Sequence, residues 1–316
     1  MFLKEFPDYN WLKQQAEKAF RGRLDVQGKK LEKEGWPVVV LNTSTTFCAR
    51  PDIKGPFSLF TNIRGNSNVQ VGSKEVTVSE DSFLITNRSQ YYSLNIESDN
   101  PVETFNLHLG QNAWEDFTYT CTASDAKLLE NPDQQVCLSA AEFPNVLQVK
   151  SQPLQVALGR LYQLSKNPVH TQLQFEEELV YLFQALVPHK KELLQAISRL
   201  PQVKQATRQE LFRRISLATD YILSDLGGQP SLDELAQLAC LSRFHFLRIF
   251  SAIYRTTPHQ FILQHKVMRS QRLLRQTSLP VGEVGLLCGF EEASSFNRCF
   301  SRYVGCSPAV YRQQAK

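Results

Sequence analysis

The alternation of apolar and polar residues changes character twice along this chain. From Pro37 to about Gly110 it follows the period of two that is typical of half-buried strands, in short runs separated by Gly, Asn and Pro. From about Pro153 the period becomes 3.6, and further helical patterns follow from about residue 210. The pattern therefore predicts a β domain, then a helical segment, then a separate all-α domain, which makes the chain an α+β multidomain protein.

Many short strands with frequent turn residues are typical of a β-sandwich or a small barrel. The predicted strands cover 38–41, 57–60, 69–71, 76–78, 83–86, 91–96 and 105–109.

Two apolar stripes mark helices after the β domain, with Pro168 and Pro188 as predicted boundaries. Such helices can pack on the β domain or pair with those of a second subunit, and dimerisation is the expected use. The stripes consist of Leu154, Leu158 and Leu161, and of Phe175, Leu179, Leu182, Phe183 and Leu186. Residues 190–209, polar and interrupted by Pro201, are expected to form a linker.

The last hundred residues carry one pattern twice. Phe246-x-Arg248-x-Phe250 with Pro258 recurs fifty positions later as Phe296-x-Arg298-x-Phe300 with Pro308. In a helix, each copy places two aromatic rings on one face and an arginine about 200° away from the first ring. One side of each helix is therefore expected to pack, and the other to expose a guanidinium.

A shorter apolar segment precedes each copy, and these two segments match at an offset of forty-nine: Leu232, Leu235 and Ala236 against Val281, Val284 and Gly285. The second turn is thus one residue longer, with Gly289 in it, and the repeated unit is helix, tight turn, helix.

Capping residues agree with this interpretation. Ser231 with Glu234 forms a capping box, Ser242 is a good N-cap, and Thr257 with Gln260 starts a helix that is expected to reach about Gln276. Its length of about 30 Å is close to the 34 Å or so of one turn of B-DNA.

Positive charge is concentrated at the same end. Residues 208–316 hold 14 Lys and Arg against 8 Asp and Glu, whereas the other residues hold 21 against 23. Twelve of those fourteen cations are arginine, which suits bidentate contacts to phosphate and guanine.

The stretch from about Leu211 to Arg312 resembles the DNA-binding domain of the AraC/XylS family of bacterial transcription regulators. Three runs carry the resemblance: Leu235-Ala236 leading to Ser242 through Phe250, Gly289-Phe290 leading to Phe296 through Phe300, and Gly305 through Arg312. Gly285 departs from the usual alanine, and Ser301-Arg302 from a common basic pair. The first departure is expected to loosen the second unit slightly, and the second to reduce its phosphate contacts.

If the paired phenylalanines are buried, helical geometry defines the outward residues of each unit. Those expected to read base edges are Phe244, Leu247, Arg248, Ser294, Asn297 and Arg298. Those expected to contact phosphates are Arg243, Ser251 and Arg302. For the arginines the alternative is a surface salt bridge, and for Phe244 it is packing within the domain.

In the family that the C-terminal region resembles, the domain before the DNA-binding domain is often a cupin-type jelly roll. The resemblance therefore implies this fold for the β domain. A metal-bearing cupin needs several histidines, yet His108 is the only histidine before residue 170, so neither a metal nor a cofactor is expected. His108 is then interpreted as an ordinary strand residue. The expected ligand is a small organic effector, with Arg64, Arg88, Tyr91 and Tyr92 as candidate contacts.

Composition and motifs narrow the classes of protein that remain possible. Seven cysteines without a C-x-x-C pair favour reduced thiols, and no apolar run resembles a signal peptide or a membrane helix, so a cytoplasmic protein is expected. No phosphate loop, H-E-x-x-H or G-x-S-x-G motif supports an enzyme. Two alternatives stay open: a metal-free small-molecule enzyme fused to a DNA-binding tail, and an architectural DNA binder without an effector.

The sequence thus predicts a homodimeric regulator that binds double-stranded DNA and is controlled by a small-molecule effector or a partner at its β domain. The family resemblance implies an activator, which would also contact RNA polymerase. Its expected parts are an N-terminal extension at 1–36, a cupin-like sensor domain at 37–150, dimerisation helices at 151–189, a linker at 190–209 and a double helix-turn-helix domain at 210–316.

Overall fold

The computed structural model describes residues 1–8, 11, 14, 36–110, 112–130, 142–201 and 204–314. The chain divides into two compact units, residues 1–191 and residues 192–316. Each unit is described by itself. In the described part of the chain, no helix is long and apolar enough to cross a membrane.

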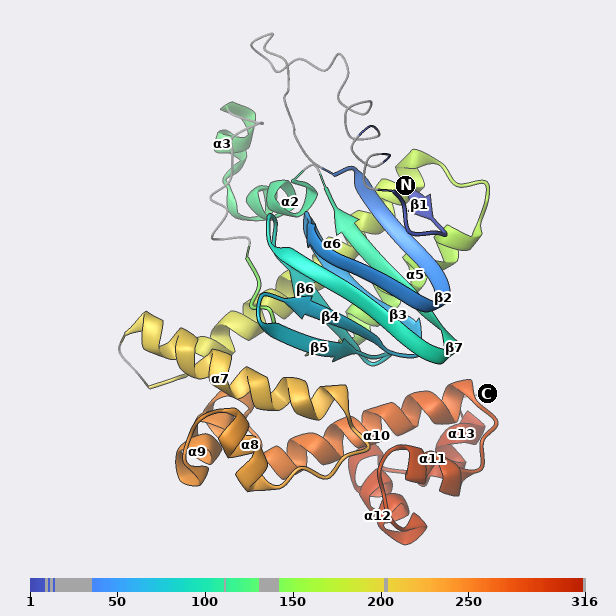
Figure 1. The fold of residues 1–316 in the computed structure, drawn as a ribbon, viewed down its shortest axis with the longest axis vertical. Helices are drawn as coiled ribbons and strands as arrows, with labels where there is room; N and C mark the ends of the chain where they lie inside the picture. The colour runs from blue at the N-terminus through green and yellow to red at the C-terminus, as the bar shows by residue number, and fades with distance from the viewer. Residues whose placement is uncertain are drawn as a thin grey trace. The chain divides into compact units, whose positions relative to one another are not determined.

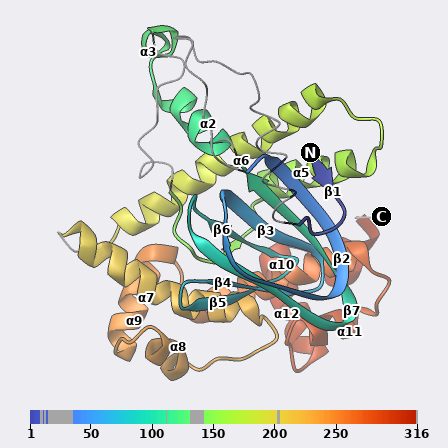
Figure 2. The same ribbon diagram turned by 45° about the horizontal axis from the view of Figure 1, so that its top comes forward.

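The first unit is built on one curled, eight-stranded sheet (Figures 1 and 2). Its main path runs β1-β2-β7-β3-β6-β8, and β4 joins β7 to β5. All pairs are antiparallel except β1 with β2. The strands are β1 (Phe2–Leu3), β2 (Val38–Lys54), β3 (Phe57–Arg64), β4 (Ser67–Val71), β5 (Lys74–Val78), β6 (Ser82–Thr86), β7 (Tyr91–Leu109) and β8 (Gln148–Val149). The expected α+β class, with a barrel-like β domain before an all-α domain, is confirmed.

Strand β7 shows how the sheet curls. Its first half pairs with β4 and its second half with β3, while β2 follows it along both halves. The register between β2 and β7 shifts between Thr45 and Phe47, opposite the segment that contains Pro101. The sequence predicts two strands separated at that segment, and this was wrong: the proline lies at an irregularity within one long strand, where a missing N–H costs no ladder hydrogen bond.

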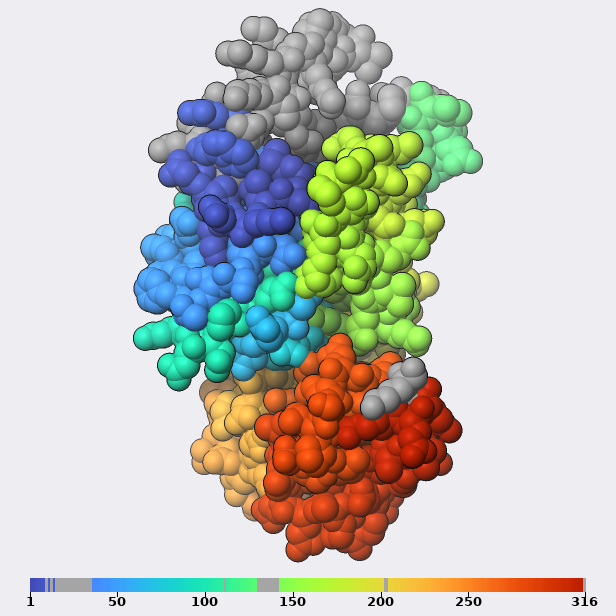
Figure 3. Space-filling view, turned by 90° about the vertical axis from the view of Figure 1, so that its right-hand side faces the viewer, coloured from blue at the N-terminus to red at the C-terminus, as the bar shows by residue number. Residues whose placement is uncertain are grey.

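Helices cover the sheet of this unit, and the two predicted apolar stripes face inward. All eight stripe residues are buried. Tyr162 meets the Phe105 ring of β7 edge-on at 5.5 Å, and Phe183 meets Trp114 at 5.7 Å. Figure 3 shows α5 and α6 (yellow-green) beside the strands of the sheet (blue). The helices are α2 (Ala113–Thr122), α3 (Asp125–Glu130), α5 (Gln152–Lys166) and α6 (Gln172–Ser198).

Helix α6 continues through Pro188, where the sequence predicts a boundary. Residues directly after the proline are held by the sheet domain. His189 Nε2 lies 2.6 Å from Gln148 Oε1, and Lys190 is buried with its ammonium over the Phe143 ring. These contacts offset the one helical hydrogen bond that proline removes.

The second unit contains seven helices from α7 onward among its described residues. They are α7 (Gln205–Ser224), α8 (Leu232–Leu238), α9 (Arg243–Tyr254), α10 (Pro258–Gln276), α11 (Val281–Leu287), α12 (Ala293–Val304) and α13 (Pro308–Gln314). Where the sequence predicts a linker over 190–209, the structure has the last turns of α6 and the first of α7.

Candidate nucleic-acid interface

The first helix-turn-helix is formed by α8 and α9. The capping box at its start is present, since Ser231 Oγ accepts from the Glu234 amide and the Glu234 carboxylate accepts from the Ser231 amide. On α9, the rings of Phe246 and Phe250 are fully buried and lie 5.6 Å apart. Because the two rings anchor one face, Arg248 is turned outward and is exposed.

The second helix-turn-helix, α11 and α12, repeats this arrangement. Phe296 and Phe300 are fully buried with ring centroids 5.7 Å apart, and Arg298 is exposed. Gly285 lies where the first unit has Ala236, and a Cβ added there would come within 2.9 Å of Phe296 Cδ1. The glycine that was expected to loosen this unit thus permits close approach of α11 to α12.

The two turns differ by one residue, as the offsets predict: residues 239–242 connect α8 to α9, whereas residues 288–292 connect α11 to α12. In both turns the second residue has a left-handed backbone, with φ of 50° at Cys240 and 74° at Gly289. Glycine adopts this conformation without strain, but a residue with a Cβ does not.

Cys240→Gly is therefore expected to stabilise the helical unit by about 1 kcal/mol, because it removes the left-handed strain. The Cys240 side chain is exposed, so little packing is lost. Chemical unfolding followed by far-ultraviolet circular dichroism would measure the gain. Cys306→Gly, at a position without positive φ, is the matched control and is expected to give no gain.

Helix α10 joins the two helix-turn-helix motifs into one body. Near its start, Phe261 packs edge-on against Phe250 of α9 at 5.5 Å. Further along, Val267 and Leu274 belong to a core cluster with Val284 and Phe300 of the second motif. The connector reaches Gln276, as predicted, and its capping box at Thr257 is present.

A second junction links the motifs directly. Gly289 lies so close to the α7–α8 loop that an added Cβ would fall 2.5 Å from the Gly227 carbonyl oxygen. The buried ammonium of Lys266, on α10, donates to the Gly289 carbonyl at 2.9 Å. Burial lowers the pKa of Lys266. Next to this contact, Gln229 donates to the Glu291 carboxylate at 3.1 Å. The turn of the second motif is therefore fixed against the loop that starts the first.

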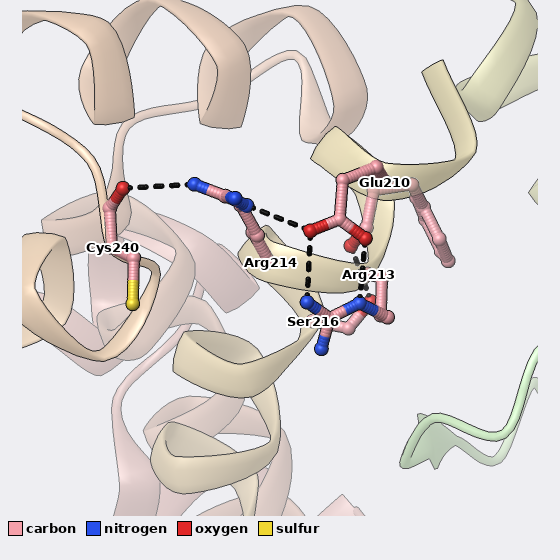
Figure 4. Close-up of polar contacts among 6 residues, drawn as sticks. Glu210, Arg213, Arg214, Ser216 and Cys240 are labelled. Carbon is pink, nitrogen blue, oxygen red and sulfur yellow. Dashed lines mark hydrogen bonds and ion pairs between the residues drawn. The ribbon is translucent and has the colours of Figure 1, made fainter. Parts of the chain in front are cut away.

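Helix α7 supports the first motif through a charged cluster (Figure 4). Glu210 accepts from Arg213 at 2.7 Å and from Arg214 at 2.9 Å, and these hydrogen bonds lower the pKa of its carboxyl group to about 2. Arg214 also donates to the Cys240 carbonyl at 3.2 Å. One guanidinium thus connects α7 to the turn between α8 and α9.

The predicted DNA-contacting residues divide by exposure. Leu247 and Ser251 are half-buried, and the remaining seven are exposed: Arg243, Phe244, Arg248, Ser294, Asn297, Arg298 and Arg302. Phe244 is 85 % exposed, so packing within the domain does not explain it. Neither Arg248, Asn297 nor Arg298 makes a hydrogen bond or ion pair to another described residue. Arg243 is different, since it is ion-paired with Asp233 of α8.

The same motifs also expose apolar residues that were not predicted from the sequence. Leu286 and Leu287 are at the end of α11, Leu238 is at the end of α8, and Tyr303 is on α12. Leu238 and Leu287 share the offset of forty-nine, which could have identified them as an equivalent pair.

The first unit contains a separate cavity of about 530 Å³ beside the sheet. Its lining includes Tyr91 and Tyr92, two of the four predicted effector contacts, but not Arg64 or Arg88, which are exposed elsewhere on the domain. Arg64 ends β3 and Arg88 is in the turn before β7, so neither side chain reaches this cavity. The lining also includes Trp36, Arg50, Lys54, Phe60 and His108.

His108 lies within β7, in agreement with its prediction as a strand residue, and it also belongs to the lining of the cavity. It is fully buried, and burial lowers the pKa of its imidazole to about 4. The alternation of β7 could have placed it on the inner face with Tyr92, sixteen positions earlier.

The buried imidazole predicts a pH dependence of stability. In the unfolded chain the histidine pKa is about 6.5, so the unfolded state takes up the proton first as the pH falls. The first unit is expected to lose about 3 kcal/mol of stability between pH 6.5 and pH 4, and none from this group above pH 6.5. The three tryptophans, Trp11, Trp36 and Trp114, all lie in the first unit, so tryptophan fluorescence during urea unfolding reports it selectively. His108→Phe is expected to flatten this part of the profile; an unchanged profile would contradict the assignment.

Comparison with known proteins identifies the class of the second unit. Residues 235–314 match a family model described as a helix-turn-helix domain. The probable transcriptional regulator LumQ of Photobacterium leiognathi is 33% identical over 96 residues, which are 30% of this chain and 39% of that protein. The MmsAB operon regulatory protein of Pseudomonas aeruginosa is 34% identical over 96 residues, 30% of this chain and 31% of that protein. The matched part thus spans less than half of either relative.

A solved structure gives a further match. The DNA-binding domain of AdpA, described as a global transcriptional factor and crystallised with a target DNA, is 32% identical and covers 32% of this chain and 91% of that one, with a TM-score of 0.31.

The second unit is a double helix-turn-helix domain. It is of the AraC type, and the resemblance read from the sequence is confirmed for this part of the chain.

Proposed function

We propose that the whole chain is a sequence-specific DNA-binding regulator of transcription. The observation that carries this proposal is the pair of arginines, Arg248 and Arg298, at equivalent positions of two motifs in one unit. Both are exposed, and neither has a hydrogen-bond or ion-pair partner among the described residues. A guanidinium donates two parallel hydrogen bonds to guanine O6 and N7 in the major groove. Arg302, Arg243 and Ser251 are proposed to hold phosphates, and Phe244 and Leu247 to meet thymine methyl groups.

Selection of bound duplexes from a random pool tests the proposal. A specific regulator enriches sites with two conserved elements about one helical turn apart, and its affinity for the enriched site exceeds that for random DNA by at least about a thousandfold. An architectural binder would enrich no sequence, and its salt dependence would account for nearly all of its affinity. A failure to enrich any motif would therefore replace the first proposal with the second.

Control by a small molecule is proposed for the first unit. The cavity has the size of an ordinary ligand site, and its aromatic lining includes Tyr91 and Tyr92. In this mechanism the effector shifts the distribution of states that differ in DNA affinity. An enzyme in the same cavity is the alternative, and chemical conversion of a bound compound would favour it. The described residues contain no group of three or more His, Cys, Asp and Glu that could hold a metal.

A homodimer is also proposed, through the outer faces of α5 and α6. The inner stripes pack within the chain, but Val156, Leu173, Val180 and Tyr181 are exposed. Gly159 lies on the same face as Val156 and has open space around it, which would permit close approach of another helix. Sedimentation with and without the selected DNA tests the dimer. Leu173→Glu is expected to give monomers, and Leu129→Glu, on α3, is the exposed control.

Activation through RNA polymerase is the proposed output, by analogy with the family alone. Transcription in vitro from a promoter that carries the selected site would show the sign of regulation directly. A decrease in transcript would assign repression instead.

A further inference from the structure

We infer that the cavity of the first unit binds an aromatic carboxylate that carries a hydroxyl group, with the hydroxyl at the buried floor and the carboxylate at the rim. The inference rests on the proposed function in one respect: in a transcription regulator, this ligand would be the effector. The ligand class itself follows from the groups that line the cavity.

The floor offers a hydrogen-bond acceptor. Ser58 Oγ lies 3.0 Å from the Pro56 carbonyl and 3.0 Å from His108 Nδ1. A hydroxyl has one hydrogen, and because the carbonyl can only accept, that hydrogen goes to Pro56. Ser58 Oγ must then accept from His108, which places the imidazole proton on Nδ1. Nε2 is left with a lone pair and has no partner among the described residues.

The state of the ring supports the same assignment. Complete burial keeps the imidazole of His108 neutral at ordinary pH, with its pKa lowered to about 4. A neutral ring with hydrogen on Nδ1 can accept a hydrogen bond at Nε2 but cannot pair with an anion there. The Tyr92 hydroxyl, buried in the same wall, also has no partner among the described residues. A ligand hydroxyl satisfies both groups, whereas a carboxylate at this depth would not.

The walls favour a flat apolar body. His108 and Tyr92 lie parallel to within 13° with centroids 6.1 Å apart, and Trp36 lies 5.5 Å from His108 on a tilted plane. Phe60 meets Tyr92 edge-on at 4.8 Å. Such faces and edges suit an aromatic ring, through stacked and edge-on contacts. A sugar would leave its hydroxyl groups without enough polar partners against these rings.

The rim carries the positive charge. Arg50 and Lys54 both line the cavity, and the same lining contains one acidic residue, Asp52. Arg50 is half-buried, and one of its nitrogens lies 3.4 Å from the Phe6 carbonyl. It also hydrogen-bonds the Cys48 side chain. Because a guanidinium carries five N–H donors, these two contacts leave donors available to a ligand. The register shift between Arg50 and Ile53, with Asp52 at a φ of 48°, is a bulge of the kind that re-aims side chains next to sites. A carboxylate is the group that a guanidinium binds in two-point fashion.

The test uses the full chain without DNA and three probes of increasing length: 4-hydroxybenzoate, 4-hydroxyphenylacetate and 4-hydroxycinnamate. Trp36 lines the cavity, so quenching of tryptophan fluorescence reports binding, and calorimetry gives the stoichiometry. At least one probe is expected to bind one per chain. Its analogue without the hydroxyl and its methyl ester are each expected to bind about tenfold or more weakly.

Variants assign the two ends of the ligand. Arg50→Gln is expected to weaken the acid at least about tenfold and to leave the ester unchanged. Arg64→Gln, an exposed arginine of the same domain outside the lining, is the matched control and is expected to change nothing. His108→Phe is expected to abolish the preference for the hydroxylated compound. Should this buried variant not fold, the comparison of ligand pairs on the native chain tests the same hydrogen bond.

Two results would overturn the inference: no binding of any of the three probes at millimolar concentration, or equal binding of the acid, the ester and the compound without the hydroxyl. Effector control is judged separately, from the DNA affinity with and without the bound probe. Binding without a change in DNA affinity would keep the ligand class and reject control by that ligand, and the DNA selection would still decide the proposed function.

Discussion

Gly289→Ala is expected to destabilise the second unit by about 2–5 kcal/mol, the sum of the left-handed backbone strain of about 1–2 kcal/mol and a steric cost of about 1–3 kcal/mol. At Gly289 the φ is 74° and the added Cβ would lie 2.5 Å from the Gly227 carbonyl oxygen and 2.8 Å from Lys266 Nζ. Because the contact with Gly227 is with a backbone atom, no side-chain rotation can relieve it. The variant is therefore expected to lose the fixed relation between the two motifs and, with it, most of its affinity for a two-element DNA site.

Two other glycines separate the causes. Gly305 has a φ of 84° but open space around it, so Gly305→Ala should show the backbone strain alone. Gly282 lies within α11 with neither a positive φ nor a neighbour within 4 Å, so Gly282→Ala should be neutral or slightly stabilising. Thermal unfolding followed by circular dichroism would rank the three variants. If Gly289→Ala were no worse than Gly305→Ala, the contact with the Gly227 loop would have no energetic role.

Arg248→Ala is expected to cost about 1–3 kcal/mol on the selected DNA site and to relax one position of that site. Arg298→Ala should do the same at a second position, about one helical turn away. The reason is that each exposed guanidinium lies on a helix fixed by two buried phenylalanines, and no ion pair within the described residues competes for it. Fluorescence anisotropy on the selected site, on single-base variants and on random DNA would measure the effects.

Arg302→Ala is the matched control for this pair. It is also exposed, on the same helix as Arg298, but as a phosphate contact it should weaken all sequences alike and reduce the salt dependence by about one charge. Equal losses on specific and random DNA for Arg248→Ala would reject its role in base recognition.

The helical domain could be predicted closely because its pattern is local and repeated. The rings at Phe246 and Phe250 are four positions apart, so any helix over this stretch places them on one face and Arg248 on another. The offsets of fifty and forty-nine likewise gave the longer second turn. What they did not give is the pairing of Arg243 with Asp233, since side chains ten positions apart on two helices meet only through the turn between them.

The cavity of the first unit could not be predicted in the same way, because its lining joins residues from four separate stretches of chain. Trp36, Arg50 and His108 come together only when β2 and β7 pair along their length. Arg64 and Arg88 are chemically equivalent candidates in the sequence, and only the curl of the sheet separates them from Arg50. The tautomer of His108 depends on Ser58, fifty positions away.

The sequence by itself determined the strand and helix periods, the two helix-turn-helix motifs and their outward arginines, because these depend on spacing along one element. The tertiary structure decided that the sheet of the same chain covers the apolar stripes of α5 and α6. It also decided how Gly289 and Lys266 join the two motifs, and which aromatic and charged side chains share a cavity. Those features depend on close approach between residues distant in the chain, and periodicity along one element carries no information about such contacts.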